Sequence, residues 1–238
     1  MDIKPEHIKL KKGQIAERLL VAGDTQRIHV LSSILEDAKL LNEYRYIVYT
    51  GKYKGKPVSL MSHGIGAPSA AIAIEEAHAL GANKIIRLGT TGGLLKEMKY
   101  GDLIVPTAAG FDKGGVIGAY IKGVNIAPAP DLQLTNAIVN ELGSRKDTYF
   151  VGPVYSADGF YREDGLVKKL SSLGFVSVEM ECATLFMLGQ LRGFKSASIL
   201  IMVDNRVNPA MQEFLAVKEM NRFAKIAAET ALNALVSD

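Results

Sequence analysis

The feature that most constrains the fold of this 238-residue chain is an alternation of short apolar runs with longer segments of helical periodicity. The short runs are β-rich, whereas the longer segments repeat their apolar positions every three or four residues. This alternation is typical of a mostly parallel sheet that is covered on both faces by helices. It predicts an α/β protein, and no shift in composition divides the chain into separate domains.

The expected elements follow from where these patterns start and stop. We expect strands at Arg18–Ala22, Tyr46–Tyr53, Pro57–Ser62, Lys84–Leu88, Leu103–Pro106, Thr148–Val154, Phe175–Val178 and Ser198–Val203. We expect helices at Thr25–Leu41, Ser69–Leu80, Asp131–Leu142, Glu163–Leu173, Glu181–Leu191 and Pro209–Val236. Residues 108–130 are rich in glycine and proline, which predicts an irregular segment.

Charge and cysteine content exclude several classes of protein. Lys and Arg number 28 and Asp and Glu number 25, so the formal net charge is +3. Both signs are interspersed, which argues against a nucleic-acid partner. The single cysteine, Cys182, excludes an intramolecular disulfide and a thiolate zinc site. With no signal-peptide pattern and no apolar stretch near the ~20 residues of a membrane span, we expect a cytoplasmic protein without a membrane partner or a metal.

Small, polar and acidic residues stand where the apolar runs end. They are Gly23-Asp24, His63-Gly64, Gly89-Thr90, Ala157-Asp158, Glu179-Met180-Glu181 and Asp204-Asn205. In open α/β sheets, ligands bind outside the carboxyl ends of the strands. The pattern therefore predicts an anion site and a group of carboxylates in one cleft.

Two segments are suited to hold an anion. In Gly89-Thr90-Thr91-Gly92-Gly93 the glycines let successive N–H groups converge and the threonines add donors, although an ordinary glycine turn has the same sequence. Arg87, within the preceding strand, needs a carboxylate or a phosphate as its partner. In Gly23-Asp24-Thr25-Gln26-Arg27 a helix N-terminus and a cation would both face an anion. The segment His63–Ser69 only partly imitates a dinucleotide fingerprint, and we interpret His63 as structural.

Three acidic residues suggest sugar binding and proton transfer. Glu179 and Glu181 lie two residues apart, so they point to one side if the segment is extended. Nearly buried acids need partners, either protein cations or a polyol such as a ribose. Asp204 ends a strongly apolar run, where its pKa can be raised for work as a general acid, or where it can simply cap a turn.

Taken together and in order, these motifs resemble the nucleoside phosphorylase family of the hexameric purine and uridine type, and the archaeal purine nucleoside and 5′-methylthioadenosine phosphorylases resemble the chain most. The resemblance rests on Val21–Arg27, Tyr49–Gly55, Ser62–Gly66, Ile86–Gly92, Ser156–Tyr161, Val178–Glu181 and Val203–Asn205. It implies one domain over residues 1–238, with a central mixed, largely parallel twisted sheet that is partly barrel-like and flanked by helices.

The resemblance also implies roles for individual residues. Phosphate, a co-substrate, would be held by Gly23, Arg27, Arg87, Gly89 and Thr90, with Arg45 reaching in from a neighbouring subunit. Ribose would lie on Met180 beside Glu179 and Glu181, with a neighbour's His7 at the 5′ position. The base would contact Gly92, Phe160, Glu163 and Val203, and Asp204 would protonate it as it leaves. The implied assembly is a homo-oligomer, a hexamer built as a trimer of dimers, and no cofactor is implied.

Departures from the family pattern bear on which base is used. Uridine-specific members carry a Gln-x-Arg pair after the Phe-Tyr of this region, but Arg162-Glu163-Asp164 follows Tyr161 here. The missing pair and the retained Asp204 favour purine nucleosides, with Glu163 as a candidate reader of the purine edge. Val203 replaces a serine often found beside the acid, and the helper arginine of the C-terminal helix is absent. Either Lys218 or Arg206 could replace that arginine.

Three other functions remain open on the sequence. Uridine phosphorolysis is one of them. A nucleosidase of the same fold would use water, and water has no need of Arg27, Arg45 and Arg87. A non-catalytic nucleoside- or dinucleotide-binding module is the third.

Overall fold

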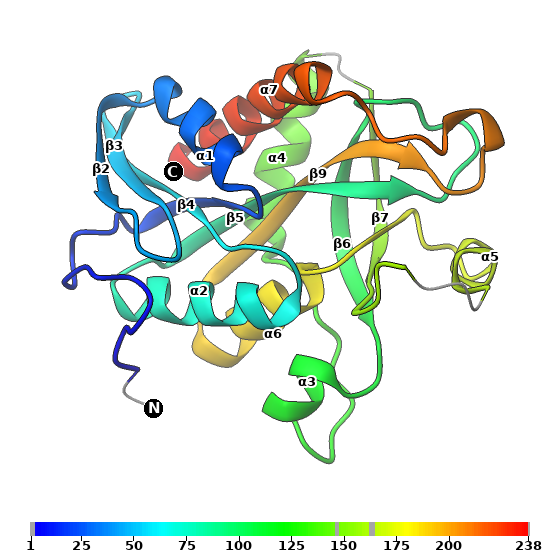
Figure 1. Cartoon of the computed structure of the whole chain (residues 1–238), viewed down its shortest axis with the longest axis horizontal. Coiled ribbons are helices and arrows are strands. Elements are labelled where there is room, and N and C mark those ends of the chain that lie inside the picture. The colour runs from blue at the N-terminus through cyan, green and yellow to red at the C-terminus, as the bar shows by residue number, and fades with distance from the viewer. Residues whose placement is uncertain (1–2, 146–147, 162–164, 238) are drawn as a thin grey trace.

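One sheet runs through the whole molecule (Figure 1). The structure is a computed structural model that describes residues 3–145, 148–161 and 165–237. Within them the strands are β1 (Arg18–Ala22), β2 (Glu36–Asn42), β3 (Val48–Tyr53), β4 (Lys56–Ser62), β5 (Lys84–Gly93), β6 (Leu103–Phe111), β7 (Tyr149–Ser156), β8 (Ser177–Glu179) and β9 (Lys195–Asn205). Their order is β2-β3-β4-β1-β5-β8-β7-β6-β9, and β9 also pairs with β5.

The β5–β9 pairing closes one half of the sheet into a barrel-like ring. Strands β1, β4, β5 and β9 run parallel to one another through successive pairs, as do β6, β7 and β8. The β5–β8 and β6–β9 pairs are antiparallel, as are β2–β3 and β3–β4. The prediction of a mixed, largely parallel and partly barrel-like sheet is confirmed.

Two groups of helices cover opposite faces of the sheet (Figure 1). Helices α2 (Ala67–Ala79), α3 (Gly115–Tyr120) and α6 (Cys182–Arg192) pack on one face, and α1 (Thr25–Leu31), α4 (Leu132–Arg145) and α7 (Val217–Val236) on the other. The period of two along a strand divides β1 between them, since Leu19 and Val21 face the α2–α6 side while Leu20 and Ala22 face the α7 side. Helix α5 (Leu166–Ser172) lies apart from both groups.

The expected helix Thr25–Leu41 is wrong in its second half. The helix ends at Leu31, a 3₁₀ turn covers Ser32–Ile34, and Glu36–Asn42 forms β2. The sequence of β2, EDAKLLN, has helix-forming residues and no β-branched ones, yet it pairs with β3 as a mostly exposed edge strand. Pairing with a neighbouring strand has overridden the local helical preference.

Other helix and strand boundaries also differ from the expected ones because hydrogen bonds to neighbouring strands decide them. Helix α7 begins at Val217, eight residues after the expected start at Pro209, because Leu215 N donates to Val203 O (2.8 Å) and holds the preceding chain along β9. Strands β5, β6 and β9 continue beyond their expected ends because β8, β7 and one another provide partners. The segment 108–130 is not wholly irregular, since it contains the end of β6 and all of α3. No helix among the described residues is long and apolar enough to cross a membrane.

Candidate active site

The loops that follow β1 and β4 lie beside the middle of β5, because residues 89–93 continue β5 and pair with β9 instead of forming a glycine loop. In the strand register Ala22 lies beside Ser62 and Leu88. His63 N donates to Ala22 O (2.9 Å), and a Cβ on Gly23 would stand 3.0 Å from Gly64 O. The first anion segment, the His63 loop and the beginning of the Gly89 segment are therefore neighbours.

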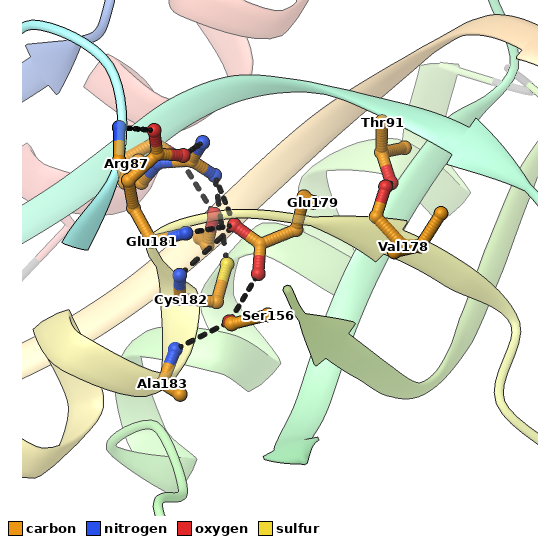
Figure 2. Close-up of polar contacts among 10 residues, drawn as sticks. Arg87, Thr91, Ser156, Val178, Glu179, Glu181, Cys182 and Ala183 are labelled. Atoms are coloured by element: carbon orange, nitrogen blue, oxygen red, sulfur yellow. Dashed lines mark hydrogen bonds and ion pairs between the residues drawn. The ribbon is translucent and has the colours of Figure 1, made fainter. Parts of the chain in front are cut away.

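Arg87 joins this edge to the two glutamates (Figure 2). Its Nη1 lies 3.1 Å from Glu179 Oε2, and its Nη2 forms an ion pair with Glu181 Oε2. All three side chains are almost wholly buried. Burial alone would lower the pKa of Arg87, but the carboxylates of Glu181 and Glu179 outweigh it and raise that pKa. A Cβ on Gly89 would collide with the guanidinium, so glycine there leaves the room that Arg87 needs.

Glu179 is fixed from several directions (Figure 2). Its Oε2 accepts from the backbone N–H groups of Glu181 (2.8 Å) and Cys182 (2.9 Å), at the N-terminal end of α6. Its Oε1 accepts from Ser156 Oγ, which itself accepts from Ala183 N (2.9 Å). Glu179 therefore anchors β8 to α6 and β7 and orients Arg87.

Glu181 stands at the N-cap position of the same helix, but its side chain bonds to other groups. It accepts from Gly66 N (2.6 Å), the residue before α2, as well as from Arg87. Its burial would raise the pKa of the carboxyl, but Arg87 together with the Gly66 N–H lowers it below its ordinary value. Glu181 is thus ionised and can accept hydrogen bonds from a polyol.

Arg27 is a buried cation with few partners. Its side chain comes from α1, and Nη2 contacts Met220 Sδ (3.5 Å) of α7, while Nε has no hydrogen-bond partner among the described residues. Burial lowers the pKa of Arg27, Asp24 partly opposes this, and the charge of Arg87 lowers it further. Two buried guanidinium groups that repel each other in this way define a position suited to an anion.

His63 lies wholly buried between these groups. Neither of its ring nitrogens makes a well-formed hydrogen bond within the described part of the chain. Burial lowers the pKa of His63 to about 4, although Glu181 opposes the shift. The imidazole is therefore neutral at neutral pH.

A second cluster surrounds Asp204 at the end of β9. Its carboxylate is 1% exposed and forms an ion pair with Arg206, and burial raises the pKa of Asp204 while Arg206 acts to lower it. Of the two replacements considered for the missing helper arginine, the structure brings Arg206 to the acid, whereas Lys218 is exposed on α7. Phe160 lies near the pair, its ring centroid 6.1 Å from that of Phe214. A Cβ on Gly92 would stand 3.0 Å from Arg206 Cγ and 3.4 Å from Asp204 Oδ1.

The single chain leaves some predicted site residues apart from these clusters. Arg45 is exposed in the turn between β2 and β3, 5.5 Å from the Tyr44 ring. His7 is held by Glu76 of α2 through its Nδ1 (2.7 Å) and its backbone N–H (2.9 Å). Thr90 and Met180 are half-buried within the site, and Val203 is buried beside Asp204. Glu163 lies outside the described residues.

The sequence reading missed several residues that complete the site. Ser156 and Gly66 orient the two glutamates, and Met220 contacts Arg27. The ring of Phe214 stacks beside that of Phe160, and these two rings form the aromatic cluster. Ser156 and Gly66 stand within matched motifs, so their position next to a strand or helix end could have singled them out. Phe214 and Met220 give no local signal, because each reaches the site only through the path of residues 206–220.

Comparison with known proteins identifies the family. Residues 17–237 match the phosphorylase superfamily. The chain belongs to this superfamily and is an enzyme of the pentosyltransferase class, as the motifs predicted.

The names of the relatives refer to different nucleosides. The chain is 36% identical over 216 residues to a uridine phosphorylase of Thermococcus kodakarensis, covering 84% of this chain and 77% of the relative. It is 31% identical over 206 residues to a guanosine phosphorylase of Halorubrum lacusprofundi, covering 86% and 85%. A crystal structure of uridine phosphorylase from Vibrio fischeri ES114 superposes with a TM-score of 0.88 at 33% identity, covering 99% of this chain and 98% of that one. These names divide between pyrimidine and purine nucleosides.

Proposed function

We propose that the protein catalyses the phosphorolysis of purine nucleosides to the free base and a ribose 1-phosphate, with 5′-methylthioadenosine as one candidate substrate that the panel below tests. The observation that carries this proposal is the pair of buried guanidinium groups at the meeting point of β1, β4 and β5. Arg87 is shared with two carboxylates, but Arg27 has no ion pair with any described carboxylate. A small dianion would neutralise Arg27 and accept hydrogen bonds from both arginines.

The phosphate subsite consists of Gly23, Arg27, Arg87, Gly89 and Thr90. Oriented there, phosphate is the nucleophile, and one of its oxygens attacks C1′ of the ribose as the bond between C1′ and the base breaks. The electron pair of that bond leaves with the base. Positive charge that develops on the sugar is stabilised by the phosphate and by the carboxylates beside Arg87.

The ribose and base subsites lie on either side of this point. Met180 supports the ribose, Glu181 accepts from its hydroxyls, and Glu179 holds Arg87 in place. The base lies by Gly92, Phe160 and Val203, and the resemblance to the family makes Glu163, outside the described residues, a candidate reader of its edge. Asp204, whose pKa is raised by burial, donates a proton to N7 of the leaving purine.

A phosphate-dependent substrate panel tests the proposal. Adenosine, inosine, guanosine, 5′-methylthioadenosine and uridine are each incubated with and without inorganic phosphate, and the free base is measured. We expect purine release only with phosphate. Equal release without phosphate would indicate a nucleosidase, and absence of release from every nucleoside would indicate a binding module.

Uridine phosphorolysis is the second candidate, because the relatives from Thermococcus kodakarensis and Vibrio fischeri bear that name. Against it stand the missing Gln-x-Arg pair and the acid Asp204, which suits a purine N7. The guanosine phosphorylase of Halorubrum lacusprofundi supports the purine assignment. Uridine turnover at least equal to that of every purine nucleoside would overturn the assignment.

We also propose that the active enzyme is a homo-oligomer, a hexamer arranged as a trimer of dimers. Arg45 and His7 lie outside the clusters of their own chain, which fits a role in a neighbour's phosphate and ribose subsites. Light scattering measures the mass. Mixing an Arg45→Ala variant with an Asp204→Asn variant tests sharing, since partial recovery of activity in the mixture requires sites built from two chains.

A further inference from the structure

Arg206 holds a fixed position beside Asp204 although it lies just beyond the buried part of β9. Its backbone N donates to Gly93 O (2.9 Å). The preceding residue, Asn205, is fully buried, and its Oδ1 accepts from the N–H groups of Val207 (3.1 Å) and Asn208 (3.0 Å). Its Nδ2 donates to Leu95 O (2.9 Å), so the turn that carries Arg206 is fastened on both sides.

The guanidinium of Arg206 faces the place where a base would lie. Its Cζ is 5.7 Å from the centroid of the Phe160 ring and 5.9 Å from that of Phe214. The side chain is 33% exposed, whereas Asp204 is 1% exposed. Arg206 therefore stands at the boundary between the buried acid and solvent, against aromatic rings that a planar base can stack on.

The ion pair leaves part of the Arg206 guanidinium accessible. Asp204 Oδ2 and Arg206 Nε are buried against each other in the pair, whereas the Arg206 side chain as a whole is 33% exposed. A ligand placed beside Asp204 can therefore reach the exposed part of the guanidinium. Gly92 keeps this space open, because a side chain there would press on Arg206.

We propose that Arg206 determines base specificity by donating hydrogen bonds to an exocyclic oxygen next to the ring nitrogen that Asp204 addresses. In a 6-oxopurine, N7 and O6 are adjacent acceptors, whereas in a 6-aminopurine the amino group beside N7 is a donor. A guanidinium offers only donors, so it bonds to O6 and is left facing another donor when the base is adenine. The expected substrates are inosine and guanosine rather than the adenine nucleosides adenosine and 5′-methylthioadenosine, so the inference narrows the purine nucleosides of the proposed function. This inference rests on the proposed phosphorolysis of purine nucleosides.

The same contact assists the reaction. As the bond to C1′ breaks, negative charge spreads over the leaving 6-oxopurine and part of it resides on O6. A cation beside O6 stabilises that charge, so the stabilisation of the leaving base depends less on the proton that Asp204 supplies to N7. Adenine gains no such stabilisation.

The test compares inosine with adenosine in the intact protein and in two variants. Arg206→Met keeps the unbranched apolar stem of the side chain and removes every donor, and Arg222→Met is the matched control on an exposed arginine of α7. The kcat/KM for phosphate-dependent base release is measured for each substrate. We expect the unaltered protein to favour inosine at least tenfold. Because Arg206 is also the ion-pair partner of Asp204, Arg206→Met should lower both values, the inosine value at least tenfold more than the adenosine value, and Arg222→Met should change neither.

The ratio of the two substrates does not depend on how much of a variant is folded. If Arg206→Met lowers kcat/KM by the same factor for inosine and for adenosine, the inference is overturned, because Arg206 would then act only on Asp204. A preference of the unaltered protein for adenosine would overturn it as well.

Binding of the free bases separates this inference from the proposed function. If neither nucleoside is cleaved with phosphate, the proposed function fails, and calorimetry with hypoxanthine and adenine still measures the selectivity of the site. A hypoxanthine preference of about tenfold that disappears in Arg206→Met supports the role of Arg206. Equal binding of the two bases to the unaltered protein contradicts it.

Discussion

The two ends of the candidate active site are built in different ways. At the phosphate and ribose end, the guanidinium of Arg87 is enclosed by two buried glutamates, and backbone N–H groups from α2 and α6 fix the carboxylates. At the base end, the buried carboxylate of Asp204 has the partly exposed Arg206 beside it, and the rings of Phe160 and Phe214 are about half exposed. The first end is preorganised by the fold, whereas the second depends on a few side chains at its surface.

In the proposed function, the first end serves the bond-breaking reaction and the second end selects the base. In that function, orienting phosphate against C1′ relies on groups that β5, β8 and α6 position together. In the same proposal, choosing the base relies on Asp204, Arg206 and the rings of Phe160 and Phe214, which belong to β9 and the loops around it. Relatives with uridine and guanosine in their names fit one shared phosphate end combined with different base ends.

The largest effect is expected from Arg87→Met, which tests whether the phosphate end depends on its buried ion pairs. Removing the cation leaves Glu179 and Glu181 as buried charges without a compensating partner, so the free energy of unfolding should fall by about 3–5 kcal/mol. Urea denaturation measures the change. Arg145→Met is the control, because Arg145 and Glu229 are separated by 3.5 Å on the surface and such pairs contribute about 0–1 kcal/mol. If the free energy of unfolding fell equally in Arg87→Met and Arg145→Met, the phosphate end would not depend on its buried ion pairs.

Asp204→Asn should lower kcat for purine nucleosides about 10³-fold, since it removes the proton donor and keeps the shape of the side chain. Phosphate binding, measured by calorimetry, should stay within twofold of the original, because Asp204 lies at the other end of the site. The exposed Asp37 of β2 provides the matched Asp37→Asn control. Unchanged turnover would show that Asp204 is not the acid, and a large loss of phosphate binding would show that the ends are not independent.

Because His63 is buried and neutral at the phosphate end of the site, we expect the free energy of unfolding to depend on pH. The pKa of His63 is about 4 in the folded protein and ~6.5 in the unfolded chain, so the unfolded chain binds more protons between these values. The free energy of unfolding should therefore fall as pH decreases from about 6.5 to about 4, by about 3 kcal/mol at most from this residue. His63→Gln should lose that part of the pH dependence, as measured by urea denaturation at pH 4.5, 5.5 and 7. The same slope in both proteins would contradict a neutral buried imidazole.

Arg27→Met should give the smallest of these effects and the clearest contrast with Arg87. The KM for phosphate should rise about ten- to a hundredfold, as expected for loss of hydrogen bonds to a charged ligand. Stability should not fall, because burial already opposes the charge of Arg27 and Met retains most of its apolar contacts. A stability loss as large as that of Arg87→Met, with unchanged phosphate KM, would make Arg27 a structural residue.

Much of the site could be predicted from local sequence because its parts stand where apolar runs end. Gly23, Glu179 and Glu181 each follow such a run near the end of a strand, and parallel strands gather such positions at one edge. Gly89 also follows an apolar run, but it lies within β5, which pairing with β9 extends to Gly93. The same reasoning failed for β2, where helix-forming residues pair with β3. It also placed the start of α7 eight residues too early, because hydrogen bonding to β9 holds residues 212–216 in another conformation.

The sequence by itself determined the α/β class, most strands, and the residue types that gather at the site. Only the tertiary structure decided which charges meet, namely that Arg87 pairs with glutamates more than ninety positions away and that Arg206 rather than Lys218 lies beside Asp204. The reason is physical. Periodicity and turn chemistry act over a few residues and can be read locally, whereas an ion pair depends on register, helix packing and loop path, which the whole sheet fixes together.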